Sequence, residues 1–387
     1  MMERLWTKSF IGMTLTLFFL CFGFYLLLPT LPLYIKQLGV SESQVGLIIG
    51  VFTLSAVVAR PIIGGLLDQY GRRIFIILGL IAFALSMYLY SWVSGIVLLL
   101  LLRIFHGVGW AISTTSIGTS ITDVIPTSRR GEGMGWYGLS MTVSMAIGPM
   151  IGVWIIQDNS FSTLFLLATA LTVIALLFAL TTKVPFSPKE HNGKIEFFDR
   201  NVTTISIAIF FLSFTYGGIT TFLPLFAESL QVNAGTFFLV YAIALTLSRP
   251  IAGKLADRYS YGFVIIPSLA ITSVALLVLS LSNSLIGVLT TAILYGIGFG
   301  AAQPTLQAAT LRLVPSHKKG VANASFFTAI DLGIGIGAIL LGLVTQFMGY
   351  HFLFTVCAVS GLISLFIYTF FVRRTLLSKE DDRSAEV

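Results

Sequence analysis

Twelve apolar runs, each long enough to cross a bilayer, constrain the fold of this chain more than any other feature. A helix of about 20 apolar residues spans a membrane, because in lipid the backbone must satisfy its own hydrogen bonds. Only 10% of the residues are charged, whereas soluble domains average about 25%. We therefore predict an all-α membrane protein with twelve transmembrane helices. They are expected at residues 9–35, 43–67, 74–92, 96–122, 133–157, 161–181, 202–228, 235–256, 262–282, 285–311, 321–348 and 351–372.

The positive charges lie mostly on one side of the predicted membrane. Lys36 falls in an outer loop and three arginines fall within runs, so nineteen of the 23 Lys and Arg are cytoplasmic if the amino terminus is cytoplasmic. This distribution obeys the positive-inside rule. The net charge of +7 therefore indicates topology rather than a nucleic-acid ligand. We expect a multi-pass protein of the plasma or inner cell membrane with both termini cytoplasmic.

The chain repeats itself at an offset of 189 residues. "RPIIGGLLDQY" from Arg60 and "RPIAGKLADRY" from Arg249 agree at seven of eleven positions, and the same offset relates Gly107 to Gly296. Upstream, "LPLYIKQLGV" from Leu31 resembles "LPLFAESLQV" at an offset of 192. Each copy holds six runs, so we predict two six-helix halves with the same orientation, a pseudo-two-fold axis along the membrane normal and a cavity between them near the midplane.

The polar segment from Thr181 divides the two copies, and its mixture of Pro, Gly and alternating charge suits a linker on the cytoplasmic membrane surface. The predicted division is an amino-terminal bundle at 1–181, a linker at 182–201, a carboxy-terminal bundle at 202–372 and a tail at 373–387.

Three motifs carry a family resemblance that covers essentially the whole chain. "GGLLDQYGRR" from Gly64 resembles motif A of the major facilitator superfamily. "LLLRIFHGVGWA" resembles motif B, with Arg103, Gly107 and Gly109 at matching positions. "GWYGLSMTVSMAIGPMIG" is similar to the antiporter motif of the twelve-helix drug:proton antiporter branch. The matching positions of this third motif are Gly135, Gly148, Pro149 and Gly152, whereas Ser144 and Val153 replace two glycines of the family.

The charges of motif A and of the facing loops predict a cytoplasmic latch. Alternating access needs networks that hold one conformation and can break; the alternative is that these charges only anchor loops. The latch candidates are Gly64, Asp68, Gly71, Arg72, Arg73, Asp123, Arg130, Glu132, Arg249 and Asp257. The glycines of the antiporter motif allow either a bending helix or ordinary tight packing.

Charges inside the runs give candidates for ion coupling, because an ionised group at mid-bilayer costs at least about 2.5 kcal/mol. Arg60 and Arg249 are equivalent in the repeat and are therefore expected to be architectural. Asp331 and Arg103 have no charged equivalent. Asp331 is the carboxylate well inside a run, and the family arrangement implies that it approaches Arg60 and carries a proton; the alternative is a permanent ion pair. His106, one turn from Arg103, is either a group that titrates near neutrality or a packing residue.

Aromatic and amide side chains near mid-depth are the candidates for a substrate cavity. An aromatic pocket with few charges suits amphipathic organic compounds, which Gln and Tyr can orient; the alternative is that these rings pack against lipid. The cavity candidates are Tyr25, Trp110, Phe214, Tyr216, Tyr295, Phe299, Gln303 and Gln307.

No motif for catalysis or cofactor binding accompanies these features. Cys21 and Cys357 lie within apolar runs, which favours packing over a disulfide or a metal site. The chain has no "GxxxxGK" loop, no nucleophile elbow and no metal spacing of histidines. We predict no enzyme activity, no metal and no cofactor, and we expect an ion gradient or the substrate's own gradient to supply the energy.

Together these patterns predict a proton-coupled exporter of small amphipathic compounds that works by alternating access. Its expected partners are the substrate, protons and the lipid bilayer, without nucleic acid, and the resemblance implies a monomer. A facilitator or importer of a metabolite with the same fold, and a lipid or glycolipid flippase, remain alternatives. The complete two-half repeat argues against a membrane-embedded enzyme or receptor.

Overall fold

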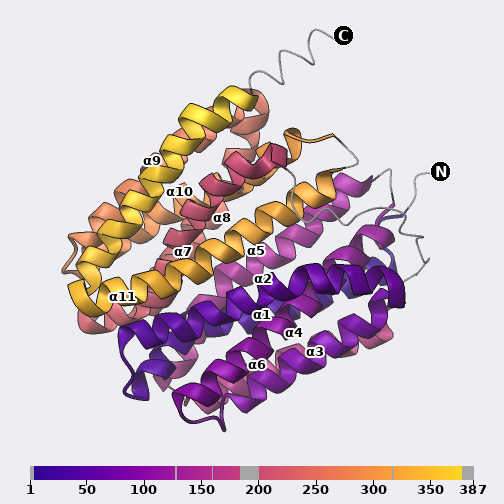
Figure 1. The fold of residues 1–387 in the computed structure, drawn as a ribbon, viewed down its shortest axis with the longest axis horizontal. Helices are drawn as coiled ribbons and strands as arrows, with labels where there is room; N and C mark the ends of the chain where they lie inside the picture. The colour runs from indigo at the N-terminus through magenta and orange to yellow at the C-terminus, as the bar shows by residue number, and fades with distance from the viewer. Residues whose placement is uncertain (1–3, 127–128, 159, 184–199, 316–317, 377–387) are drawn as a thin grey trace. The chain divides into compact units, whose positions relative to one another are not determined.

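The computed structural model of the chain is built from long helices (Figure 1). It describes residues 4–126, 129–158, 160–183, 200–315 and 318–376. No strand occurs in these described ranges. The all-helical class predicted from the apolar runs is therefore confirmed for the described residues.

Each predicted run coincides with helical backbone. The helices of the first half are α1 (Lys8–Gln37), α2 (Glu42–Tyr70), α3 (Arg72–Leu89), α4 (Ile96–Val124), α5 (Arg130–Asp158) and α6 (Phe161–Thr181). After a 3-10 turn, η2 (Arg200–Val202), come α7 (Thr203–Ser229), α8 (Ala234–Arg258), α9 (Tyr261–Ser280), α10 (Leu285–Arg312), α11 (Lys319–Ile367) and the π-helical turn η4 (Tyr368–Val372).

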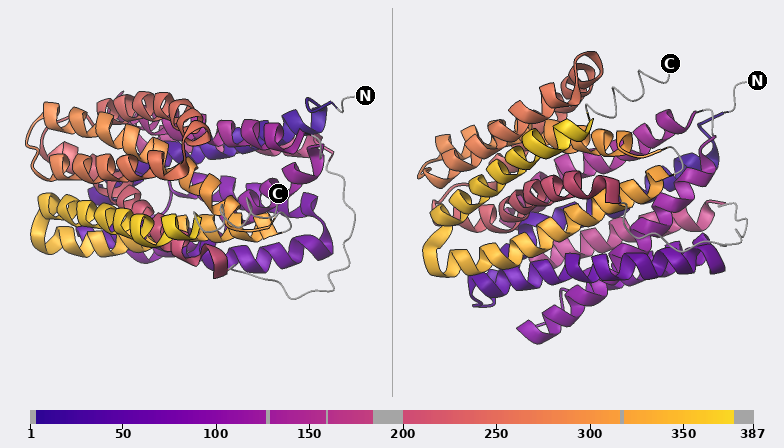
Figure 2. Two further views of the ribbon diagram at one scale, coloured as in Figure 1. Left: turned by 90° about the horizontal axis from the view of Figure 1, so that it is seen from above. Right: turned by 45° about the horizontal axis from the view of Figure 1, so that its top comes forward.

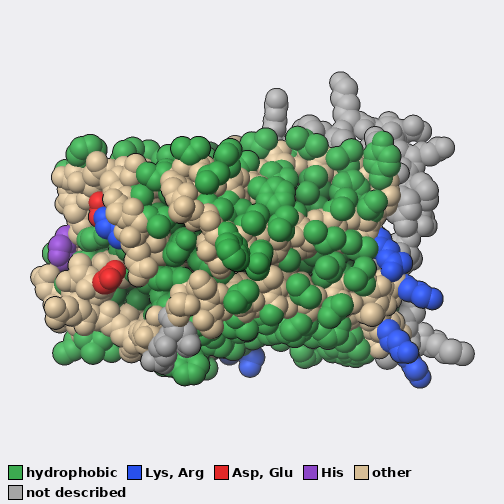
Figure 3. Space-filling model, turned by 90° about the horizontal axis from the view of Figure 1, so that it is seen from below, with side chains coloured by type: hydrophobic (Ala, Val, Ile, Leu, Met, Phe, Trp, Pro, Cys, Tyr) green, Lys and Arg blue, Asp and Glu red, His purple; other side chains and the backbone are tan. Residues whose placement is uncertain are grey.

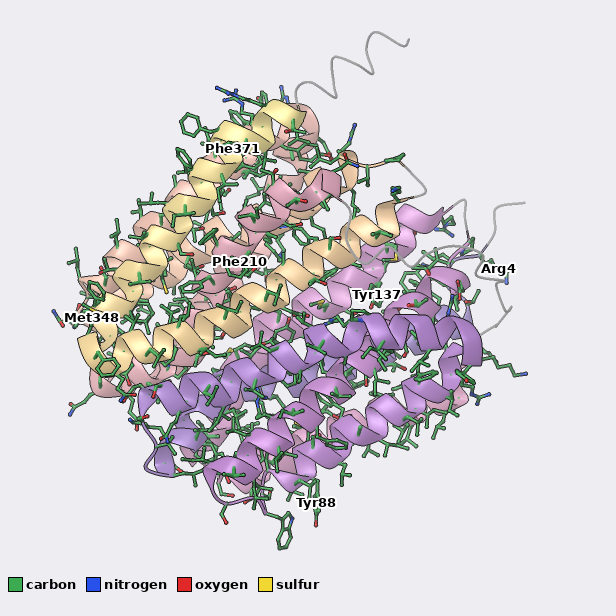
Figure 4. All side chains as sticks on the ribbon, viewed as in Figure 1. Arg4, Tyr88, Tyr137, Phe210, Met348 and Phe371 are labelled. Carbon is green, nitrogen blue, oxygen red and sulfur yellow. The ribbon has the colours of Figure 1, made fainter. Side chains whose placement is uncertain are left out.

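Eleven described helices are long and apolar enough to cross a membrane. The last of these spans, Val321–Leu376, is 56 residues long. It contains one residue with non-helical dihedral angles, Gly349, at φ 79° and ψ 175°. The chain reverses its direction there, next to Met348 (Figure 4). The predicted runs 321–348 and 351–372 lie on either side of this residue.

Two compact units divide the chain. Unit 1 consists of Met1–Val40 and Val51–Ile195, and unit 2 consists of Ser41–Gly50 and Glu196–Val387. Two further views (Figure 2) show the helices of each unit running side by side. Residues 184–199 of the predicted linker and 377–387 of the predicted tail lie outside the described residues.

Small residues let α1 and α5 approach closely in unit 1. A Cβ atom placed on Gly152 would overlap the carbonyl oxygen of Leu26, and one on Gly148 would lie 2.6 Å from Cβ of Tyr25. Gly135, by contrast, has no atom within 4 Å of such a Cβ. Two glycines of the predicted antiporter motif are thus packing positions, and the third is not.

In unit 2, α7 packs against both stretches of α11. A Cβ on Gly217 would lie 2.7 Å from the carbonyl oxygen of Ile334 in the first stretch. In the second stretch Ser364 donates a hydrogen bond of 2.7 Å to the carbonyl oxygen of Ala208. Phe210, which lies on α7 between Ala208 and Gly217, is labelled in Figure 4 and marks this helix.

The outer surface of the helices is apolar. Hydrophobic side chains predominate on the face drawn in Figure 3, and Trp92 and Phe347 are among the large exposed ones. Tyr88 and Phe371 also point away from the ribbons (Figure 4). Contact of such a surface with lipid tails costs no free energy, whereas its exposure to water is unfavourable.

We predict that Gly152→Ala lowers the free energy of unfolding by about 1–3 kcal/mol, because the added methyl group forces α5 away from α1. Gly135→Ala is the matched control and is expected to leave stability unchanged. Cys21 and Cys357 are both buried, so a thiol-reactive fluorogenic maleimide reports thermal unfolding of the purified protein. Equal midpoints for the two variants would contradict the packing role of Gly152.

Candidate functional site

An arginine in each copy of the repeat ties two helices together. In unit 1, Nη1 of Arg60 on α2 donates a hydrogen bond of 3.1 Å to Oγ1 of Thr114 on α4. In unit 2, Nη2 of Arg249 on α8 donates one of 3.2 Å to Oε1 of Gln303 on α10. Thr114 and Gln303 are themselves 189 residues apart. The repeat therefore preserves the acceptor position as well as the donor, and we call each pair an arginine clamp.

A stacked pair of rings accompanies each clamp on the same helix. Trp110, one turn before Thr114, stacks on Phe24 with ring centroids 4.3 Å apart. Phe299, one turn before Gln303, stacks on Tyr216 at 4.9 Å. Of these four rings, sequence reasoning missed only Phe24. The signal was present, because the upstream offset of 192 relates Phe24 to Tyr216.

The other cavity candidates are held by neighbours within their own unit. Tyr295 is buried, and its hydroxyl shares a hydrogen bond of 2.9 Å with Oγ1 of Thr215. Gln307 donates from Nε2 to Oδ1 of Asn323 at 2.9 Å. Tyr25 packs against Gly148 of α5, and Phe214 packs against Gly337 of α11. The six aromatic candidates are buried, whereas Gln303 and Gln307 are partly exposed.

His106 and Arg103 meet at a third residue that the sequence did not indicate. The hydroxyl of Tyr90, which follows α3, lies 2.9 Å from Nδ1 of His106 and 3.4 Å from Nη1 of Arg103. All three residues are buried. The guanidinium carbon of Arg103 also lies 4.3 Å from the ring centroid of Phe52, a distance typical of a cation–π contact.

This geometry favours one tautomer of the neutral imidazole. A guanidinium only donates, so the Tyr90 oxygen accepts from Arg103. Among the described residues Nδ1 of His106 is the acceptor within reach of the Tyr90 proton, which favours the tautomer with its proton on Nε2. This atom is buried, and no hydrogen-bond partner for it occurs among the described residues. The rings of Phe52 and Phe83 lie against the imidazole ring, with centroids 4.8 Å and 4.5 Å from its centroid.

Asp331 lies partly buried on the first stretch of α11. Gly335 and Ala338, four and seven residues further on, share its face of the helix. They contact Gly50 and Gly46, in the part of α2 that belongs to unit 2. Because Arg60 belongs to unit 1, the expected approach of Asp331 to Arg60 stays a prediction.

The latch candidates of motif A tie α3 to neighbouring helices. Arg72 forms an ion pair with Asp123 at the end of α4, and its Nη1 also donates to the carbonyl oxygen of Thr119 at 3.2 Å. Arg73 donates to the carbonyl oxygen of Leu180 at 3.0 Å. Gly71, directly before α3, has φ 85°, which favours glycine.

Three of the remaining latch candidates have other surroundings in the described part of the chain. Glu132 forms a local ion pair with Arg129 at 2.7 Å. Asp257 is exposed near the end of α8, and a Cβ on Gly64 would meet no atom within 4 Å. The side chains of Asp68 and Arg130 lie outside the described residues. The latch as a switching element stays a prediction.

The chain matches one family along nearly its whole length. The family model described as Major Facilitator Superfamily matches residues 13–338 and, in a second match, residues 205–386. The chain belongs to the major facilitator superfamily. The resemblance indicated by motif A is thereby confirmed. The chain is a multi-span membrane protein of a family that transports small molecules.

Two relatives of this superfamily member have names that describe export or resistance. The Staphylopine export protein of Staphylococcus aureus is 27% identical over 354 residues, which cover 84% of this chain and 87% of the relative. Multidrug resistance protein 1 of Bacillus subtilis is 25% identical over 355 residues, which cover 87% and 90%.

A solved structure supports the fold of this superfamily member. It is a bacterial homologue of the human lysosomal transporter Spinster, in an inward-facing and unoccupied conformation. The TM-score is 0.79 at 17% sequence identity, and the match covers 96% of this chain and 97% of the other. At this identity the likeness concerns the fold alone.

We predict that Tyr90→Phe lowers the free energy of unfolding by about 1–3 kcal/mol, because Nδ1 of His106 and one N–H of Arg103 then lack a buried partner. Tyr88→Phe is the control, since Tyr88 is exposed two residues earlier. The thiol-based unfolding assay described above measures both variants. A Tyr90→Phe protein as stable as the wild type would show that the hydroxyl does not hold Arg103 and His106 together.

Proposed function

We propose that this chain exports small amphipathic organic compounds in exchange for protons. The observation that carries the proposal is Asp331, a partly buried carboxylate in the apolar interior of α11. Ionisable groups inside membrane helices are expensive and mark ion pathways. The names of the two relatives, which describe export and multidrug resistance, support the direction of transport and the substrate class.

The proposed transporter has twelve spans. At 1.5 Å per residue, a straight 56-residue helix would be about 84 Å long, whereas the hydrocarbon core is about 30 Å thick. The turn at Gly349 supports two spans in place of one. Together with the distribution of Lys and Arg described above, an even number of spans supports a cytoplasmic location for both termini. We also propose that the two six-helix bundles predicted from the repeat act as a monomer.

In this proposal Asp331 exchanges its proton as access alternates. Burial favours the protonated carboxyl, whereas water or a nearby cation favours the carboxylate. Asp331 would bind a proton when its site opens to the more acidic side and release it when the site opens to the other side. The substrate crosses in the opposite direction during the return. The ion pair between Arg72 and Asp123 is a contact that such a cycle can break and reform.

A facilitator or importer of the same fold is the second candidate, and Ser144 favours it. Where the antiporter motif has a glycine, Oγ of Ser144 lies 3.1 Å from the carbonyl oxygen of Phe18 on α1 and 3.0 Å from that of Ser140 within α5, and its single proton is shared between them. The hydroxyl thus adds a polar contact between α5 and α1 that the glycine of the motif would not make.

We predict that Asp331→Asn abolishes proton-coupled transport, because an amide cannot carry the proton. The assay uses everted vesicles acidified by respiration, a dye quenched by the pH gradient, and a panel of cationic, neutral and anionic amphipathic compounds. Wild-type protein is expected to relieve the quenching with at least one compound, and Asp331→Asn with none. Glu228→Gln, which changes an exposed carboxylate near the end of α7, is the control and should behave as wild type.

Two results would contradict the proposal. Full activity of Asp331→Asn would exclude Asp331 as the carrier. Folded wild-type protein that responds to no compound would favour the facilitator.

A further inference from the structure

The two arginine clamps look equivalent, but they leave different groups available for a ligand. In unit 1, Oγ1 of Thr114 accepts from Arg60 at 3.1 Å and donates to the carbonyl oxygen of Trp110 at 2.7 Å. A hydroxyl has a single proton. The Thr114 donor is therefore already engaged within α4.

The Gln303 amide in unit 2 keeps both of its donors. Arginine has no acceptor, so the amide atom 3.2 Å from Nη2 of Arg249 must be the oxygen. The chemistry of the pair thus fixes the orientation of the amide. Nε2 then points away from Arg249, and no described residue accepts a hydrogen bond from it. Gln303 is also partly exposed, so its N–H groups are accessible.

A buried stack of three rings lies beside Gln303 and holds this part of α10 in place. Phe299 lies one turn earlier on α10 and stacks between Tyr216, at 4.9 Å, and Tyr295, at 5.5 Å. Charge on Arg249 polarises the amide whose oxygen it binds, which makes the N–H groups stronger donors. An oxygen atom that accepts a hydrogen bond, as in a carbonyl or carboxylate group, fits these two donors.

We propose that Gln303 donates a hydrogen bond to the transported compound, that Arg249 positions its amide, and that the substrates therefore carry an oxygen acceptor. This inference rests on the proposed function, whose substrate class it narrows. Thr114, the equivalent residue of unit 1, has no such role, so recognition of the acceptor belongs to unit 2 alone.

The test measures equilibrium binding, which requires neither a proton gradient nor turnover. The probe is 6-propionyl-2-(dimethylamino)naphthalene, whose emission shifts to the red when its carbonyl accepts a hydrogen bond. Its partner, 2-dimethylamino-6-propylnaphthalene, has a methylene in place of the carbonyl. The full-length protein is held in lipid nanodiscs, and energy transfer from tryptophan selects the probe molecules bound to protein.

We expect Gln303→Leu to weaken binding of the carbonyl probe about five- to tenfold, the effect of one hydrogen bond, and to remove the red shift. Binding of the methylene partner should change less than twofold. Arg249→Leu should reduce the red shift, and Arg249→Lys should restore it, because lysine also only donates. Thr114→Val, the matched change in unit 1, should leave both probes unaffected.

Three results would overturn the inference. Gln303→Leu could weaken binding of both probes equally, which would make Gln303 a packing residue. The same variant could leave binding of the carbonyl probe unchanged. Wild-type protein could bind neither probe, which would exclude this class of ligand. Wild-type binding with the expected discrimination, but without proton-coupled transport, would support the inference and contradict the proposed function.

Discussion

The need to satisfy polar groups away from water governs this structure. Within a membrane, a charged or hydrogen-bonding side chain needs a partner, because none is supplied by lipid. Arg60 and Arg249 satisfy this requirement in the same way, because each donates a hydrogen bond to a side chain on a neighbouring helix, α4 and α10 respectively. The hydroxyl of Tyr90 satisfies two residues at once, because it forms hydrogen bonds with both Arg103 and His106.

The sequence predicted the helices well because each apolar run carries its own signal. Hydropathy located every helix, and the repeat located the two arginines. It also contained the partners of the clamps, since Thr114 and Gln303 obey the same offset of 189. A search for polar residues related by that offset would have found this pair, even though one copy has a threonine and the other a glutamine.

Contacts between distant helices could not be predicted in this way. Tyr90 is 16 residues from His106, and nothing in the spacing indicates that the end of α3 turns back over α4. The division of the antiporter motif into packed and unpacked glycines likewise depends on what lies opposite α5. Gly152 faces the backbone at Leu26, and Gly135 faces open space. The motif alone treats these glycines as equivalent.

The turn at Gly349 has a consequence for biosynthesis. A single residue with φ 79° connects the two stretches of α11, so no free loop separates them. Once this turn has formed, no length of chain between the two stretches can remain in water. The two stretches of α11 are therefore expected to enter the membrane together as a helical hairpin. A side chain at this position would disturb that step, because the left-handed backbone favours glycine.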